Sequence, residues 1–359
     1  MKLLLRIVAI VLVLVVLAAA AAEFMLVRQA RKLAAEGQMG LGEAAMLADP
    51  ARIGGRLTGV TVPVGEWQQL ELSEVDLWVP SLAWNVPHAS LPAQVTLVDP
   101  NWQRVVTFAG GQVQARFSPF RNMALVAAGL DARDARLDDR PIAAQARIEA
   151  RLTNYGAVVP AEVQAAYRID STIEGLNLPM LARMLEIGEP SGERAGATDI
   201  DGPLTLWVSN VITPRGRMPP RVLGASFDGL RISVDGAEMR VWGQLARTPS
   251  GMVNGELALD STALRDFILG LAHAGYLPLD YAQLTATALE TVAREAEGAD
   301  PAPQTPISSP NLVALRRPAG NPHIPPRPEG VTRVPLRIED GQIYLGSLAL
   351  GALLQRGQP

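Results

Sequence analysis

The sequence predicts a mainly β protein: an N-terminal transmembrane helix followed by an extended, twisted antiparallel β-sheet with a few covering helices. The chain opens with a bilayer-length apolar run, and from about Gly55 short runs of alternating apolar and polar residues follow, which is typical of strands. Its 32 glycines and 28 prolines punctuate these runs, as turns require. With 359 residues, 48% of them hydrophobic, the chain can build one large or two ordinary domains.

Residues 1–24 form the predicted transmembrane anchor or signal segment. Lys2 and Arg6 precede an unbroken apolar run from Ile7 to Ala22. Counted from Leu3, about 20 residues at 1.5 Å each are available, which can span a bilayer as a helix. The alanines at 18–22 also suit a cleaved secretory signal with an A-x-A site. We favour a retained single-pass anchor, with a cleaved signal peptide and a soluble exported protein as the alternative; both place the bulk of the chain outside the cytosol.

The segments that follow the anchor change character near residue 50. Residues 25–50 predict a juxtamembrane helix, loosened around Gly37, Gly40 and Gly42. Residues 51–298 predict one antiparallel β-rich domain, with strand-like runs such as RLTGVTV, LELSEVDLWV and RVVTFA. Helices are expected within it near 178–187, 261–274 and 280–297, where the apolar residues recur at helical spacing.

The clearest strand pattern is ASFDGLRISVDGAEMRVWGQLA, residues 225–246. Two Asp-Gly pairs, Asp228-Gly229 and Asp235-Gly236, predict tight turns and hence a three-stranded meander. Its polar face carries Arg231, Ser233, Glu238 and Arg240. Its apolar face is the candidate lipid-contact surface, consisting of Phe227, Leu230, Ile232, Val234, Met239 and Val241.

A proline-rich stretch separates this domain from the C-terminus. Residues 299–333 predict a disordered tether, because proline cannot donate to a strand ladder and restricts the residue before it. Residues 334–352 then predict a β-hairpin that returns to the main sheet, with Asp340-Gly341 as its turn, so that Leu336 faces Leu345 and Ile338 faces Ile343. The apolar residues change parity after Tyr344, which predicts a bulge at Gly346.

The composition argues against several kinds of chemistry. A net charge of −4 gives no electrostatic basis for nucleic-acid binding, and the absence of cysteine excludes disulfides, thiolate metal sites and cysteine nucleophiles. The three histidines, His88, His273 and His323, have no metal-ligand spacing. Without a nucleophile elbow, phosphate loop or dinucleotide fingerprint in a suitable context, we expect no enzyme activity, catalytic residue, cofactor or metal site.

Four segments resemble parts of known families. The N-terminal span, WVPSLAWNVPHASLPAQVTLVDP and PLRIEDGQIYLGSLALG together resemble an uncharacterised bacterial envelope family, domain of unknown function (DUF) family 2125. GELALDSTALRDFILGLAHAGYLP is similar to a strand–helix pattern of AsmA-like envelope proteins, whose sheets have an apolar inner face linked to lipid handling. The resemblance implies a protein of the bacterial inner membrane with its bulk in the periplasm.

Two functions follow as hypotheses. In the first, the apolar face binds an acyl chain or another envelope lipid, and the N-terminal helix holds the protein at the membrane. In the second, helices cover that face completely, and the protein is a structural or interaction protein whose partner is another envelope protein.

Overall fold

The computed structural model describes most of the chain after residue 38. The described residues are 34, 39–47, 49, 51–63, 68–80, 83–155, 159–160, 162–177, 198–214, 220–298, 324–345 and 348–352. The expected anchor at 1–24, the expected helix at 178–187 and residues 299–323 of the expected tether lie outside them. Within the described part of the chain, no helix combines the length and the apolar character that crossing a membrane would need.

The described structure is mainly β, with antiparallel strands and two helices. In chain order its elements are β1 (Glu43–Met46), β2 (Arg52–Pro63), β3 (Gln69–Pro80), β4 (His88–Ser90), β5 (Gln94–Asp99), β6 (Trp102–Thr107), β7 (Gly110–Ser118), the 3-10 turn η1 (Pro119–Arg121), β8 (Ala124–Leu137), β9 (Arg140–Thr153), β10 (Ala165–Leu176), β11 (Thr198–Val208), β12 (Val222–Val234), β13 (Ala237–Arg247), β14 (Val253–Ser261), α4 (Leu264–His273), α5 (Leu279–Gly298), β15 (Thr332–Glu339), β16 (Gln342–Leu345) and β17 (Leu348–Ala352).

The chain divides into two compact units, whereas the sequence assigns 51–298 to one β-rich domain. Unit 1 takes its described residues from within Met1–Arg151, Thr172–Glu189 and Ile212–Met218, and unit 2 takes them from the remaining segments. The strands β1–β8 belong to unit 1, and β11–β17 with both helices belong to unit 2.

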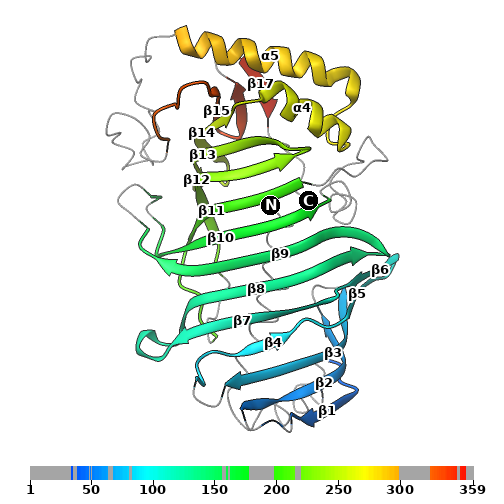
Figure 1. Ribbon diagram of the computed structural model, residues 1–359. Coiled ribbons are helices and arrows are strands. Elements are labelled where there is room, and N and C mark those ends of the chain that lie inside the picture. Colours follow the sequence, from blue (N-terminus) through cyan, green and yellow to red (C-terminus); the bar gives the residue numbers. More distant parts are fainter. Residues whose placement is uncertain are drawn as a thin grey trace. The chain divides into compact units, whose positions relative to one another are not determined.

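Unit 1 is an antiparallel sheet that branches at β3. One end of β3 pairs with β4, which continues to β7, and the other end pairs with β5, which continues to β6. Both branches meet again on β8 (Figure 1). The core of β1–β4 gathers on one face and consists of Met39, Ala44, Leu57, Val60, Leu70, Leu72, Val75, Leu77 and Ala89.

The expected helix at 25–50 is present at Ala34 but wrong for the later residues of the segment that the structure describes. Glu43–Met46 is strand β1, which pairs with β2 from Gly55 to Thr58. Gly40 and Gly42, which the sequence suggests as helix breaks, instead let this segment approach β2 closely: the Gly42 amide donates to Thr58 O at 3.0 Å. A Cβ on Gly42 would lie 3.1 Å from that same oxygen, a tight contact that glycine avoids.

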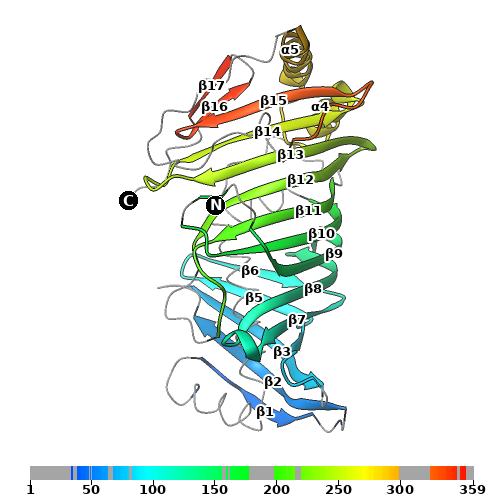
Figure 2. The same cartoon turned by 90° about the vertical axis from the view of Figure 1, so that its left-hand side faces the viewer.

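Unit 2 is a meander in which each strand from β11 to β17 pairs antiparallel with the next (Figures 1 and 2). The predicted turns at Asp235-Gly236 and Asp340-Gly341 are confirmed, and in both pairs the two residues have positive φ. The predicted facing pairs in both hairpins are confirmed as well, including Ile232↔Met239 and Ile338↔Ile343.

The predicted turn at Asp228-Gly229 is wrong. β12 runs through these residues as one strand, and the register shifts between Asp228 and Leu230, which leaves Gly229 as a bulge. Gly229 has φ +84°, and the Trp242 ring lies where its side chain would be, 2.7 Å from an ideal Cβ. Both a turn and a bulge use a glycine at positive φ, so the local sequence does not distinguish them.

The C-terminal segment also differs from the prediction. Residues 334–352 form three strands instead of one hairpin, because β16 ends at Leu345 and β17 begins at its partner Leu348. After Tyr344 the apolar residues shift from one set of alternate positions to the other, and a reversal of the chain produces this shift as well as a bulge does. The predicted bulge position, Gly346, lies outside the described residues. The register shift in this pair lies further along, between Ile343 and Tyr344.

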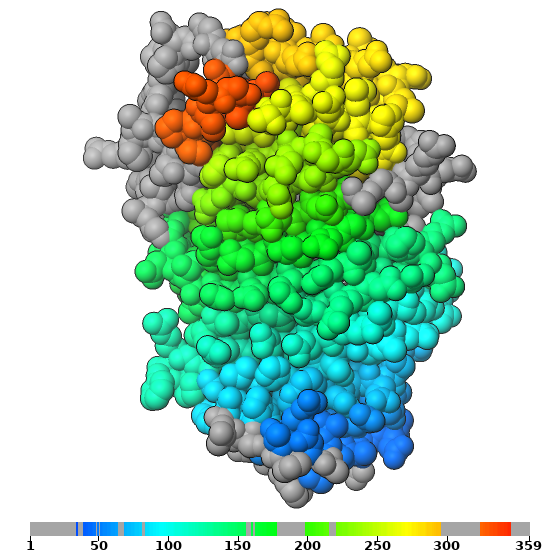
Figure 3. Space-filling model, in the orientation of Figure 1, coloured from blue at the N-terminus to red at the C-terminus, as the bar shows by residue number. Residues whose placement is uncertain are grey.

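Helices α4 and α5 occupy the segments for which the sequence predicts helices, 261–274 and 280–297. They pack together over one end of the unit 2 sheet, and Figure 3 shows their atoms, yellow to orange, against those of the neighbouring strands. The core they form consists of Val234, Ala237, Met239, Leu264, Phe267, Ile268, Ala272, Ala274, Ala282, Ala286, Val292, Ala293, Val334 and Leu345.

A buried ion pair attaches β15 to β14. The Arg333 guanidinium donates to both carboxylate oxygens of Asp260 at 2.6 Å, and the two side chains are only 17% and 6% exposed. Arg333 also donates to Pro325 O at 2.7 Å, which holds the segment that leads into β15. Since Asp260↔Arg333 is also a register pair, the ion pair fixes the alignment of the strand that follows residues 299–323.

We expect Arg333→Met to destabilise unit 2 strongly. It leaves the Asp260 carboxylate buried without its cation, which typically costs about 3 kcal/mol or more. Hydrogen exchange of the β14 and β15 amides should accelerate. Arg265→Met, which breaks the exposed pair with Glu290, is the matched control and should leave that exchange unchanged. Equal exchange in the two variants would contradict the assigned role.

Candidate functional site

The structure places the six candidate lipid-contact residues on one face of unit 2. The β12–β13 register pairs Leu230 with Val241, Ile232 with Met239 and Val234 with Ala237, so these side chains share a face. In a regular strand, residues an even number of positions apart share a face, and Phe227 lies three positions before Leu230. The bulge at Gly229 takes up the extra residue, so Phe227 stays on the same face as Leu230. The six residues are together despite the wrong turn.

The α4/α5 core covers part of this face. Val234 and Met239 are buried in it at 0% and 6% exposure, and Ile232 packs against it. Leu230 and Val241 are also buried, at 8% each, whereas Phe227 is half-buried. The exposure of the candidate residues therefore increases from the helix-covered end of the face toward Phe227.

The face that carries the α4/α5 core also has two apolar rows that cross the strands, and one of them ends in that core at Leu345. One row is Leu204, Phe227, Gly243, Leu257, Leu336 and Leu345, and each residue is the register partner of the next. The other row is Leu206, Ala225, Leu245, Gly255, Ile338 and Ile343. We call five half-buried large side chains of these rows, none of which belongs to the α4/α5 core, the outer strip: Leu204, Leu206, Phe227, Leu245 and Leu257.

A glycine interrupts each row of the outer strip. Gly243 stands between Phe227 and Leu257, and Gly255 stands between Leu245 and Ile338. Gly243 has φ +116°, and an added Cβ would collide with the Glu256 carbonyl oxygen, so the position accepts no side chain. The rows consequently have side-chain-free positions on an otherwise apolar face.

On the opposite face, the part of β12 and β13 that lies behind the α4/α5 core is charged. Arg231 and Arg240 are register partners, a like-charge pairing that alone would be unfavourable. Arg231 donates to Glu238 at 3.2 Å and to Asp201 at 3.3 Å, and these carboxylates offset the repulsion. Behind the outer strip the opposite face also carries apolar residues, among them Trp207 and Ala258 at 2% and 3% exposure, but these two are buried. The large side chains of the outer strip are half-buried, so the outer strip is the candidate surface for an apolar ligand.

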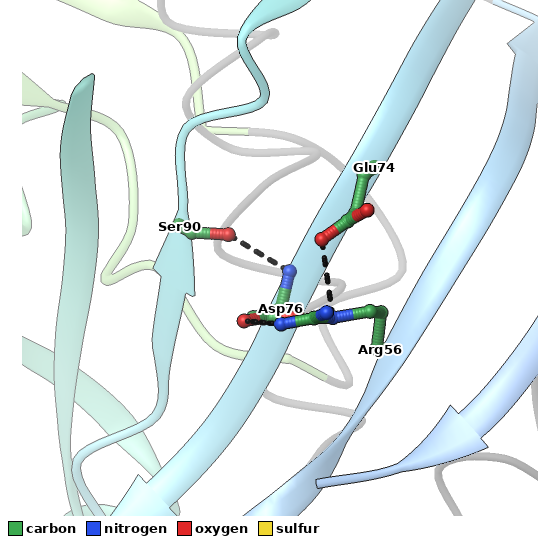
Figure 4. A network of polar contacts seen from close by, with 4 residues as sticks. All are labelled: Arg56, Glu74, Asp76 and Ser90. Carbon is green, nitrogen blue, oxygen red and sulfur yellow. Dashed lines mark hydrogen bonds and ion pairs between the residues drawn. The ribbon is translucent and has the colours of Figure 1, made fainter.

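Unit 1 contains a separate polar network, shown in Figure 4. Arg56 forms a two-pronged pair with Asp76 at 2.7 and 3.0 Å and a further pair with Glu74 at 3.1 Å, and the Asp76 amide donates to the Ser90 hydroxyl at 2.8 Å. The hydrogen bond and charge of Asp76, followed by the charge of Glu74, raise the pKa of Arg56 above its usual value. Arg56 of β2 pairs with two carboxylates of β3, and Ser90 of β4 accepts from the β3 backbone, so the network connects three neighbouring strands.

Next to this network, Trp78 stacks on His88 with ring centroids 5.4 Å apart and an interplanar angle of 10°. The Arg52 guanidinium lies over the same tryptophan, 5.3 Å from the ring centroid. Burial, and then the charge of Arg52, lower the pKa of His88 below 6.5. His88 belongs to β4 and is the register partner of Trp78 in β3.

The outer strip extends the candidate surface that the sequence suggests. Alternation in PLTLWV and GELALD, which contain Leu204, Leu206 and Leu257, is the available signal. That signal does not say which strands pair. Only the register of β11–β15 brings these residues alongside Phe227.

Comparison with known proteins identifies no relative: no family model, curated protein or solved structure matches the chain. Over the described residues, no group of three or more His, Asp or Glu side chains is placed to hold a metal ion. A functional proposal therefore depends on the geometry of the outer strip and on the sequence.

We expect Gly243→Ala to be far more destabilising than Gly236→Ala. The first combines a left-handed backbone with a backbone collision and should cost about 3 kcal/mol or more. The second has φ +81° and nothing within 4 Å of the added Cβ, so it should cost only about 1 kcal/mol. Denaturant unfolding followed by tryptophan fluorescence measures both, and similar midpoints would show that the rows tolerate a side chain at position 243.

His88 should make stability depend on pH. Because its folded-state pKa lies below 6.5, the unfolded chain takes up the proton first as the pH falls, so stability decreases below about pH 6.5. His88→Gln should flatten that dependence between about pH 7.5 and pH 5. Thermal melting measures it, with His273→Gln, at an exposed position, as the control. A decrease as steep in His88→Gln as in the unaltered chain would refute the assignment.

Proposed function

We propose that this protein is a non-enzymatic, membrane-anchored periplasmic envelope protein that binds an acyl chain of a lipid along the outer strip. The observation that carries the proposal is the outer strip, whose five large apolar side chains lie on the face of the α4/α5 core, outside that core, and remain half-buried. Burying such surface against a hydrocarbon chain is favourable by about 25 cal/mol per Å².

The dimensions of the rows suit this ligand. The row from Leu204 to Leu336 crosses the five strands β11–β15, and neighbouring strands lie about 4.8 Å apart, which gives a length of about 19 Å. One leaflet of a bilayer has a hydrocarbon depth of about 15 Å, half of the whole core. An extended acyl chain therefore matches the row in length.

The membrane placement has different support. It rests on the apolar run from Ile7 to Ala22 and on the resemblance to DUF family 2125 and to AsmA-like proteins. A retained anchor keeps the outer strip near a source of lipid, and the cleaved-signal alternative would make the protein a soluble periplasmic lipid binder.

The second candidate function is a structural or interaction protein of the envelope without a ligand. The burial of Val234 and Met239 under α4 and α5 favours it, because that end of the face is already a closed core. A partner protein would then occupy the outer strip by the same burial of apolar surface.

Photo-crosslinking of the full chain in cells tests both. With benzoylphenylalanine in place of Phe227, ultraviolet light should yield a covalent adduct whose mass and labelling identify an acyl lipid. The same probe in place of Arg240, which is exposed on the polar face, should not. A protein adduct at position 227 would support the interaction function, and no adduct or an equal lipid adduct at both positions would eliminate lipid binding.

A further inference from the structure

The turn between β7 and β8 carries a phenylalanine at its apex in full contact with solvent. Phe120 is 100% exposed, and the next most exposed large hydrophobic residue of the described chain, Leu284, is 69% exposed. Isolated apolar residues on a surface are common. The construction of this turn and its charges are what distinguish Phe120.

The turn is held firmly at its base. Phe117 and Leu125 are register partners that are 2% and 5% exposed. Asn85 braces them: its carbonyl accepts from the Phe117 amide at 2.9 Å, and its side chain donates to Phe117 O at 2.9 Å. The Leu125 amide donates to Ile212 O at 2.8 Å.

The apex itself has a defined and costly conformation. Pro119 opens the 3-10 turn η1, and the two residues that follow the turn, Asn122 and Met123, have φ of 51° and 57°. Consecutive non-glycine residues in the left-handed region persist only when their surroundings impose them. The backbone of the turn therefore holds Phe120 at the apex, where its side chain projects into solvent.

Positive charge surrounds the apex. Arg121 follows Phe120, and Arg116 and Arg151 both pair in register with Ala127, so they lie on one face close to the turn. All three side chains are exposed, and Glu149 neutralises Arg151 at 2.7 Å. No carboxylate of the described chain forms an ion pair with Arg116 or Arg121, so the apex is basic and complements an anionic surface.

We propose that the β7–β8 apex contacts an anionic lipid surface, with Phe120 inserted at the level of the headgroups and with Arg116 and Arg121 against lipid phosphates. Aromatic rings and basic residues together are typical of membrane-interface contacts. A stable protein interface buries about 800 Å² per partner, which one turn cannot supply. The inference rests on the proposed placement at a membrane and not on acyl binding to the outer strip.

The cysteine-free chain permits a direct test. Phe120→Cys and Asp139→Cys, each labelled with the polarity-sensitive dye NBD, are made in the full chain and reconstituted into vesicles of phosphatidylethanolamine and phosphatidylglycerol. Position 139 is the matched control, because it is an exposed turn residue at the other end of β8, about 45 Å along a 14-residue strand. Emission at position 120 should shift to shorter wavelength and be quenched by lipids carrying a nitroxide near the headgroup, whereas position 139 should show neither effect.

The charge requirement is tested in the same preparation. Phosphatidylcholine in place of the mixture, or Arg121→Glu in the Phe120→Cys chain, should abolish most of the shift. Equal signals at 120 and 139, or no shift at 120 in a chain that floats with the vesicles, would overturn the inference and leave the anchor proposal standing. A chain that does not float would refute the anchor proposal itself.

Discussion

The constraint on which unit 2 depends is that apolar side chains stay on one face of the meander while the chain reverses direction. Strand side chains alternate, so one inserted or missing residue would move every later side chain to the opposite face. Residues with positive φ keep the apolar side chains on one face. Two-residue turns reverse the chain at Asp235-Gly236 and Asp340-Gly341, and the bulge at Gly229 takes up one extra residue within β12. The α4/α5 core and the outer strip both depend on this constant alternation of side chains.

The Asp260–Arg333 pair shows how a strand remote in sequence joins that meander. The apolar pairs between β14 and β15 supply the favourable burial, but such contacts are similar at neighbouring registers. A buried two-pronged ion pair tolerates only one alignment, because any slip leaves a charge without its partner. Hydrophobic burial thus stabilises the pairing, and the ion pair specifies it.

Apolar surface has three different environments in this protein. Val234 and Met239 are covered by helices, the outer strip is half-buried, and Phe120 is wholly exposed. Only the last two can gain free energy from a new apolar contact, so the proposed acyl and membrane contacts are assigned to them. The polar network around Arg56 gains less from a new contact, because each of its charges already has a partner.

The sequence by itself determined what local backbone chemistry decides: the mainly β class, the turns at Asp235-Gly236 and Asp340-Gly341, and the face shared by Leu230, Ile232 and Val234. It failed where one local signal fits two structures. A glycine at positive φ suits a turn or a bulge, and Asp228-Gly229 became a bulge because β12 continues along β13 and Trp242 fills the space beside Gly229. The glycines at 40 and 42 suggested a broken helix, but pairing with β2 made that segment a strand. The two rows of the outer strip were decided by tertiary structure alone, because strand register depends on partners that are distant in sequence.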